Sequence, residues 1–223
     1  SGKYKGRHFD IPRSFKARPT TDFAKENLFN ILNNMIDFED IKALDLFSGT
    51  GSISLELLSR GCSEVTSIEM DSLHFSFLKK SQATLGDNNW RIVRDDVFRF
   101  IRRCSASYDL IFADSFGHEP YMIQAAKEFP EVEFCHATGT TAHTENVANF
   151  HNAFASIYEG RYLAGIAAGL KLKEMMAADE TIVPKIGYVG AFTYAEVISG
   201  YTSFYLGAKS VCPSVTMDVK FTG

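Results

Sequence analysis

The sequence predicts an α/β fold: a doubly wound, mostly parallel Rossmann-like sheet of about seven strands, with helices on both faces. Three observations predict it. Short apolar runs alternate with helical patterns along the chain. A glycine-rich turn follows one of the first strands and leads directly into a helix. The 223 residues, 45% hydrophobic and 22% charged, are enough for one such core or two small lobes.

The N-terminal segment 3–20 is expected to be an arm, because it is basic, interrupted by prolines and without an apolar period. Residues 1–20 carry six basic residues against one acid. Such an arm is suited to contact with phosphates, and a solvated tail is the alternative interpretation. Thr20, Thr21 and Asp22 can cap a helix over 23–35, whose apolar residues recur at helical spacing.

The most informative stretch is a strand, turn and helix over 43–60. Residues 43–47 predict a buried strand, 48–51 (Ser-Gly-Thr-Gly) a tight turn, and 52–60 a helix. Glycines allow a sharp turn and close approach of a ligand, and free N–H groups at a helix start favour polar or anionic groups. A second strand over 65–69 ends at Glu69, 24 residues after Asp45. An acid at about this distance can hold ribose hydroxyls, so the unit predicts an adenosine-containing cofactor.

The alternation of strands and helices continues to the end of the chain. Further helices are expected over 72–85, 97–104, 119–129, 146–173 and 194–206, and further strands over 90–94, 108–113, 132–136, 185–191 and 215–221. Right-handed crossovers predict the order 3-2-1-4 for the first four strands, with later strands beyond the fourth. One continuous sheet is the leading architecture, and two lobes hinged near 138–144 are the alternative.

Acidic residues stand near the carboxyl ends of four successive strands, where doubly wound sheets bind their ligands. They are Asp45, Glu69, Asp96 and Asp114. One such acid is usually a helix cap, but four in successive units favour a site. The four cysteines lie far apart without a CxxC pair, which argues against a metal site or disulfides and for free thiols in a reducing compartment.

Several motifs of the first half occur together in one family. They are Lys5-Gly6-Arg7, Arg18-Pro19-Thr20, Glu26-Asn27-Leu28-Phe29, Asp45 to Gly51 (DLFSGTG), Leu58-Ser59-Arg60-Gly61, Ile68-Glu69 and Asp109 to Asp114 (DLIFAD). In these motifs, residues 2–114 resemble the bacterial small-subunit ribosomal RNA guanine-N2 methyltransferases. The resemblance implies a cytoplasmic enzyme that uses S-adenosylmethionine. It also implies RNA as a partner of the basic arm, through Arg7, Arg18 and Thr20.

The same resemblance implies which residues hold the cofactor. Glu69 would hold the ribose hydroxyls, with Met70 beside the adenine, and Asp96 and Val97 would face the adenine edge. The residues around the methionine and ribose parts would be Asp45, Phe47, Gly49, Thr50 and Gly51.

At the end of the fourth strand the family has Asp-Pro-Pro-Tyr, whereas this chain has Asp114-Ser115-Phe116-Gly117. The family's acid and a proline-fixed carbonyl accept hydrogens from the target amine, and its aromatic ring stacks on the flipped base. In this chain Asp114 is the candidate catalytic acid and Phe116 the candidate stacking ring. The loss of both prolines predicts impaired methyl transfer.

A different set of motifs fills the second half. They are Ser115 to His118 (SFGH), Ala125 to Val132 (AAKEFPEV), His136 to Gly139 (HATG), Arg161 to Gly169 (RYLAGIAAG) and Lys185 to Val189 (KIGYV). In these motifs, residues 115–223 resemble the basic membrane lipoprotein family of periplasmic binding proteins. The resemblance implies a fold that binds purine nucleosides or related ligands between two lobes.

The two resemblances meet within a single expected strand. Residues 1–114 carry 16 Lys/Arg and 16 Asp/Glu, and residues 115–223 carry 7 and 11, so the net charge of −4 lies in the second half. Natural fusions join whole domains at linkers. We therefore interpret the chain as an engineered chimera of two halves, 1–114 and 115–223, that complete one sheet. Apolar surface left by missing strands would favour self-association, and no membrane segment is expected.

Three functional hypotheses follow from the sequence. The first is a methyltransferase-derived protein that retains cofactor binding but has impaired methyl transfer. The second is an active ribosomal RNA guanine-N2 methyltransferase. The third is a non-enzymatic scaffold or a fragment that binds purines or nucleosides.

Overall fold

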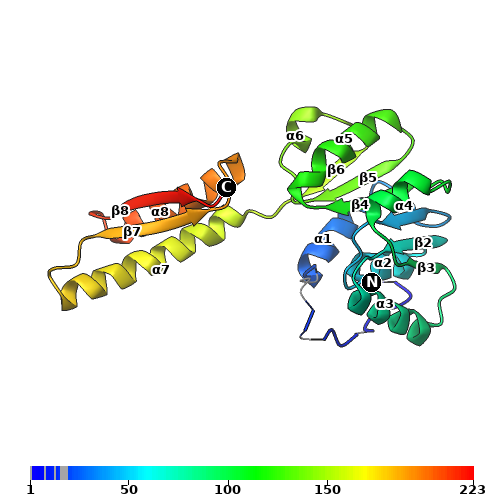
Figure 1. Ribbon diagram of the computed structural model, residues 1–223, viewed down its shortest axis with the longest axis horizontal. Coiled ribbons are helices and arrows are strands. Elements are labelled where there is room, and N and C mark those ends of the chain that lie inside the picture. Colours follow the sequence, from blue (N-terminus) through cyan, green and yellow to red (C-terminus); the bar gives the residue numbers. More distant parts are fainter. Residues whose placement is uncertain (1, 8, 13, 16–19) are drawn as a thin grey trace. The chain divides into compact units, whose positions relative to one another are not determined.

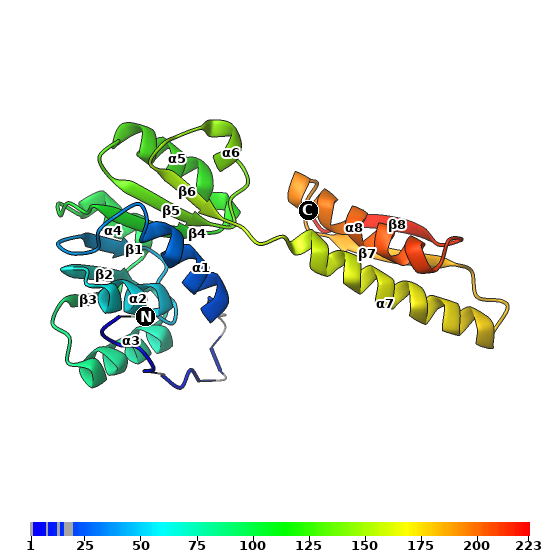
Figure 2. The same cartoon turned by 180° about the vertical axis from the view of Figure 1, so that it is seen from behind.

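The computed structural model describes residues 2–7, 9–12, 14–15 and 20–223. The chain consists of two compact units, Ser1–Phe154 and Ala155–Gly223 (Figures 1 and 2). Each unit has its own sheet and its own hydrophobic core. The boundary between the units lies beyond the hinge at 138–144 that the two-lobe alternative predicts.

The first unit is built on a six-stranded parallel sheet in the order β3-β2-β1-β4-β5-β6. Its strands are β1 Lys42–Asp45, β2 Glu64–Ile68, β3 Trp90–Val93, β4 Leu110–Asp114, β5 Glu133–Ala137 and β6 Phe150–Ala153. Every neighbouring pair is parallel. The predicted order 3-2-1-4, with later strands beyond the fourth, is confirmed.

Helices cover both faces of this sheet, as the sequence predicts. They are α1 Asp22–Leu32, α2 Ser52–Arg60, α3 Ser72–Leu85, α4 Val97–Arg103, the 3-10 turn η1 Phe116–His118, α5 Glu119–Glu128 and α6 Ala142–Glu145. One core cluster joins Phe29 of α1 and Leu57 of α2 to the sheet. A second cluster joins Phe100 of α4 and Met122 of α5 to it. The doubly wound α/β class is therefore confirmed.

The second unit is a compact pair of helices with a small sheet. It comprises α7 Ile157–Ala178, β7 Lys185–Gly190, α8 Ala195–Val211 and β8 Thr216–Phe221. The strands β7 and β8 pair in parallel and form a two-stranded sheet of their own. The buried residues of this unit's core are Leu172, Ala208, Cys212 and Val215. Among the described residues, no helix combines the length and hydrophobicity that crossing a membrane requires.

The expectation of one continuous sheet of about seven strands is wrong. Six strands form the first sheet, and β7 and β8 belong to a separate one. The expected helix over 146–173 is wrong at its start, because 150–153 is strand β6 and the helix begins at Ile157. Phe150 is buried in the second core cluster and its segment pairs with β5. Pairing with an exposed sheet edge overrides the weak helical pattern there.

Candidate functional site

The glycine turn and Glu69 form one hydrogen-bonded unit at the carboxyl ends of β1 and β2. Gly49 and Gly51 have φ of 52° and 73°, in the left-handed region that favours glycine. The Gly49 N–H donates to Glu69 Oε2 at 2.9 Å, and the Asp71 N–H donates to Oε1 at 2.7 Å. Each oxygen retains a lone pair, so the carboxylate can still accept hydrogen bonds from a pair of hydroxyls.

Gly51 also brings the start of α2 close to its neighbours. A Cβ at this position would lie 2.5 Å from Leu78 Cδ2 and 3.1 Å from the Trp90 ring. The N-cap residue of α2 is Gly51 itself, which has no side chain to cap the first N–H groups of the helix. The turn therefore combines a close-packed backbone with donors that suit a polar group.

Asp45 ends β1 and is the most deeply buried acid of the predicted site, with 5% of its surface exposed. Burial raises the pKa of Asp45 to about 6. Ser54 Oγ donates to its Oδ2 at 2.6 Å, which lowers that pKa, and the charges of Asp114 and Glu69 raise it. The structure thus brings three of the four predicted acids into electrostatic contact.

A polar chain behind Asp45 was not predicted from the sequence. Ser54 Oγ lies 2.6 Å from Ser67 Oγ, and Trp90 Nε1 donates to Ser67 Oγ at 2.7 Å. All of these groups are buried. The chain links α2, β2 and β3 beneath the site, and its two serines have no sequence spacing that distinguishes them from ordinary core residues.

The predicted adenine-facing residues lie at the start of α4 and after β2. Asp96 Oδ1 accepts the Arg99 N–H at 2.9 Å, so this acid caps α4, which is the ordinary role of an acid at a strand end. Val97 is buried, and Met70 is 64% exposed. Neighbouring Asp95, in contrast, is paired with Arg99 and Arg103.

The loop after β4 has a backbone conformation that a proline at position 115 could not adopt. Ser115 has φ of 72°, a conformation that proline with φ near −65° cannot adopt. The Ser115 carbonyl accepts the His118 N–H at 3.0 Å and lies 3.0 Å from His136 Nε2. Desolvation raises the pKa of Asp114, against the opposite effects of His118 and His136. The Phe116 backbone lies in η1, and its side chain is outside the described residues.

Three residues that the sequence did not single out as site residues lie in or beside this loop. His136 is buried in β5; burial lowers its pKa, and the bond to the Ser115 carbonyl opposes that shift. Glu119 is buried at the start of α5 and accepts the N–H groups of Thr140 and Thr141 at 2.8 and 2.9 Å. Burial alone would raise the pKa of Glu119, but these bonds outweigh it and lower the pKa.

The third residue, His118, lies against the end of β1. Its imidazole stacks on the Phe47 ring with 4.6 Å between centroids and an interplanar angle of 2°. Phe98 of α4 contacts the same imidazole edge-on at 5.8 Å. Phe47 therefore lies next to the glycine turn, and the His118 side chain covers one face of its ring.

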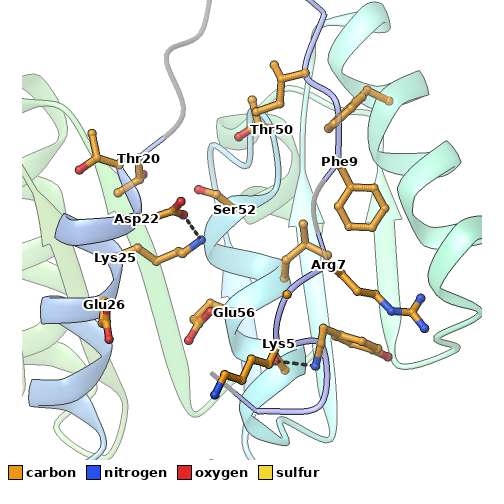
Figure 3. A pocket seen from close by; sticks show the side chains of 17 residues that line it. Lys5, Arg7, Phe9, Thr20, Asp22, Lys25, Glu26, Thr50, Ser52 and Glu56 are labelled. Carbon is orange, nitrogen blue, oxygen red and sulfur yellow. Dashed lines mark hydrogen bonds and ion pairs between the residues drawn. The ribbon is translucent and has the colours of Figure 1, made fainter.

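A cavity of about 520 Å³ lies beside the glycine turn, between the N-terminal arm, α1 and α2 (Figure 3). Arg7 and Thr20 line it, together with Thr50. Arg18, the third residue predicted to contact RNA, lies outside the described residues. The charged residues of the lining have both signs; they are Lys5, Arg7, Asp22, Lys25, Glu26 and Glu56.

The start of the arm is tied to the first unit rather than solvated. The Lys3 and Tyr4 N–H groups donate to Ser59 O and Oγ at 2.8 and 2.9 Å, and the Tyr4 hydroxyl bonds to Asp87. Further along, the Phe15 ring lies 4.4 Å from that of His74, whose Nδ1 is 3.8 Å from Glu69 Oε2. The arm thus reaches the neighbourhood of the predicted ribose site.

Comparison with known proteins separates the chain into two overlapping matches. The family model of conserved hypothetical protein 95 matches residues 1–133, and that of the PnrA-like ABC transporter substrate-binding proteins matches residues 84–223. Ribosomal RNA small subunit methyltransferase D of Escherichia coli is 38% identical over 113 residues, which are 51% of this chain and 56% of that protein.

Two further matches are a curated protein and a solved structure. The purine-binding protein BAB2_0673 of Brucella abortus is 38% identical over 125 residues, which are 56% of this chain and 32% of that protein. The structure of the Thermus hypothetical protein TTHA0928 superposes with a TM-score of 0.50 at 22% identity, over 60% of this chain and 78% of that one. At that identity, the likeness supports the α/β fold alone.

The chain spans about half the length of the first relative and a third of the second. Both family models cover more than half of the chain, and they overlap over residues 84–133. Both predicted resemblances are confirmed. The chain therefore belongs to the conserved hypothetical protein 95 family over residues 1–133 and to the PnrA-like ABC transporter substrate-binding protein family over residues 84–223.

Proposed function

We propose that the first unit binds S-adenosylmethionine at the carboxyl ends of β1 to β4, and that its methyl transfer is impaired. The observation that carries this proposal is the Glu69 carboxylate. Two backbone N–H groups orient its oxygens, one of them from the glycine turn, at 2.9 and 2.7 Å. An acid oriented in this way can bind vicinal hydroxyls without paying the entropy of ordering its side chain.

The other predicted residues fit the same cofactor by their chemistry. Met70 offers exposed apolar surface for an adenine, and Asp45 offers a carboxyl group for a cationic part of the cofactor. When bound, the cofactor would supply an electrophilic methyl group. The chain's residues would bind and orient it, with Glu69 at the ribose and Asp45 beside the methionine part.

The loop after β4 supports the proposal that methyl transfer is impaired. Asp114 remains available, but the left-handed Ser115 replaces a residue whose φ would be fixed near −65°. The Asp114 carbonyl accepts a hydrogen bond from His118, and the Ser115 carbonyl accepts one from His136. Neither carbonyl is therefore free to accept a hydrogen from a target amine in this conformation. Because a displacement of about 1 Å can cost roughly a hundredfold in rate, this backbone disfavours catalysis.

We further propose that the chain is an engineered chimera. The two family models overlap over 84–133, which includes β4, α5 and the start of β5. A parallel strand followed by a helix is common to both doubly wound families, so either parent can supply this stretch. An origin by natural fusion would place the joint in a linker rather than inside a sheet.

Substitution of Glu69 tests the cofactor site. Glu69→Ala and Glu69→Gln are expected to weaken binding of S-adenosylhomocysteine by about 10- to 100-fold, because hydrogen bonds to a charged group contribute about 1.5–3 kcal/mol each. Isothermal titration calorimetry measures the affinity. Glu64→Ala, at the opposite end of β2, is the matched control and should bind like the parent. Equal affinity of Glu69→Ala and the parent would reject the site, and absence of heat from the parent would reject cofactor binding.

Methyl incorporation tests the second part of the proposal. The parent chain is expected to transfer no more radioactive methyl to bacterial small-subunit ribosomal RNA than a Gly49→Arg variant. That variant places a bulky side chain at a left-handed position in the turn, so it serves as the background. Incorporation clearly above this background would show an active methyltransferase, and the impaired-transfer proposal would then be abandoned.

A further inference from the structure

We propose that the His118 imidazole is a built-in competitor that occupies the Phe47 face, so that the cofactor must displace it. The inference rests on the proposed function and adds an autoinhibitory contact to it. Phe47 lies in the stretch that matches only the methyltransferase-like model, and His118 lies in the overlap of the two models.

The His118 imidazole packs against two aromatic rings in the way that a planar ligand ring would. The imidazole lies parallel to Phe47 at 2° and 4.6 Å, which is within the range of stacked aromatic pairs. Phe98 approaches from the side at 5.8 Å with an interplanar angle of 66°. We call this position, between Phe47 and Phe98, the ring site.

The ring site belongs to the predicted cofactor region. Phe47 precedes Gly49 by two residues in the turn, and Phe98 directly follows Val97, which the resemblance places at the adenine edge. Phe47 comes from the stretch that matches only the methyltransferase-like model, and Phe98 comes from the overlap of the two models. A flat heteroaromatic ring is therefore the ligand class that fits between them, and an imidazole from the protein's own chain already fills that position.

Hydrogen bonds anchor the competing ring. His118 Nδ1 lies 2.8 Å from the Asp114 carbonyl, and since a carbonyl only accepts, this nitrogen carries the proton. The His118 N–H also donates to the Ser115 carbonyl at 3.0 Å, and His136 Nε2 holds that carbonyl from the other side. A ring held in this way reduces the fraction of binding-competent molecules, and a ligand's apparent affinity falls by the same fraction.

Removal of the imidazole tests the proposal by calorimetry. His118→Ala is expected to bind S-adenosylhomocysteine about tenfold more tightly than the parent. His118→Phe keeps a stacked ring and should bind no more tightly than the parent. The matched control is His151→Ala, which removes a histidine paired with Glu133 on β6 and should leave affinity unchanged. Thermal melts of each variant establish that it is folded.

Nuclear magnetic resonance of the His118 ring protons gives a second readout. Stacking on Phe47 should shift them upfield, Phe47→Leu should remove that shift, and saturating S-adenosylhomocysteine should also remove it. Failure to see an upfield shift, or a shift that persists in the ligand complex, would overturn the inference. Binding by the parent with an unchanged affinity in His118→Ala would overturn it while leaving the proposed function intact. Absence of binding in every variant would refute the proposed function itself, and with it the competition.

Discussion

Replacement of Gly165 by alanine is expected to unfold the helix pair of the second unit and to leave the first unit folded. A Cβ at Gly165 would lie 1.9 Å from the Phe204 carbonyl oxygen and 3.0 Å from the Ala208 nitrogen. Both are backbone atoms of α8, so no side-chain rotation relieves the clash. Gly207 makes the reciprocal approach, because its Cβ would lie 2.0 Å from the Tyr162 carbonyl oxygen.

The expected loss of stability is large compared with the total free energy of unfolding of this small unit. Overpacking a close contact costs about 1–3 kcal/mol, and more where backbone must move. The second unit buries only a small core around Leu172 and Val215, beneath a two-stranded sheet. Units of this size have little stability in reserve. Separation of α7 from α8 should therefore expose the whole core.

Because the chain has a single tryptophan, the unfolding of the two units can be followed separately in one experiment. Trp90 is buried in the first unit, so its fluorescence during urea denaturation reports that unit alone. Far-UV circular dichroism reports both units, and Gly165→Ala should lose helical signal without a change in the Trp90 transition. Gly160→Ala is the matched control in the same helix: apart from its chain neighbours and the backbone of α7 itself, no atom of the described residues lies within 4 Å of its Cβ position. It should stabilise α7 by up to about 1 kcal/mol. A Gly165→Ala variant with the parent's helical signal would show that α7 and α8 do not pack as described.

The first four strands could be predicted because local rules determine them. The glycine turn, the helix that follows it and Glu69 are close in sequence, and the right-handed crossover then specifies the strand order. The hydrogen bond from Gly49 to Glu69 spans only 20 residues. For the same reason, the candidate cofactor residues near the turn lie together as expected.

The later strands depend on pairing that sequence patterns do not encode. Val147, Phe150 and Ala153 recur at a spacing of three, which also fits a helix, and only pairing with β5 makes the segment a strand. Likewise, alternating strands and helices predict neither where one sheet stops nor where another begins. β7 and β8 pair with each other and not with β6.

The contacts around the loop after β4 could not be predicted from the sequence for a different reason. The parallel pairing of β4 with β5 sets Ala113 beside His136, and this brings His136 to the Ser115 carbonyl. No motif spacing indicates that contact, because it joins two strands through their register. His118 was visible in the sequence only as part of a family motif. Its position on Phe47 depends on the left-handed Ser115.

Asp45→Asn is expected to remove a large part of the pH dependence of the first unit's stability. The pKa of Asp45 rises from 3.8 to about 6 in the folded protein because the carboxyl is buried. Between those values the folded state binds more protons than the unfolded state. The free energy of unfolding should therefore fall as pH rises from about 4 to 6, by roughly 3 kcal/mol at 1.36 kcal/mol per pKa unit. Stability from this group is complete below pH 4 and lost above pH 6.

The difference between parent and variant isolates this contribution. An asparagine stays neutral and can still accept from Ser54, so Asp45→Asn should gain stability relative to the parent as pH rises from 4 to 7. Urea titrations followed by Trp90 fluorescence at several pH values measure that gain. Glu119 acts with the opposite sign, because its lowered pKa makes stability fall as pH falls, but it is present in both proteins and cancels.

Two further variants make the test specific to the buried carboxyl. Ser54→Ala removes the hydroxyl that donates to Asp45 and should move the loss of stability to higher pH. Glu131→Gln alters an exposed acid and should leave the pH profile of the parent unchanged. If the stability difference between Asp45→Asn and the parent is the same at pH 4 and pH 7, Asp45 does not titrate in this window. The acid would then be charged throughout, as it would be if it were held by a cation or open to water.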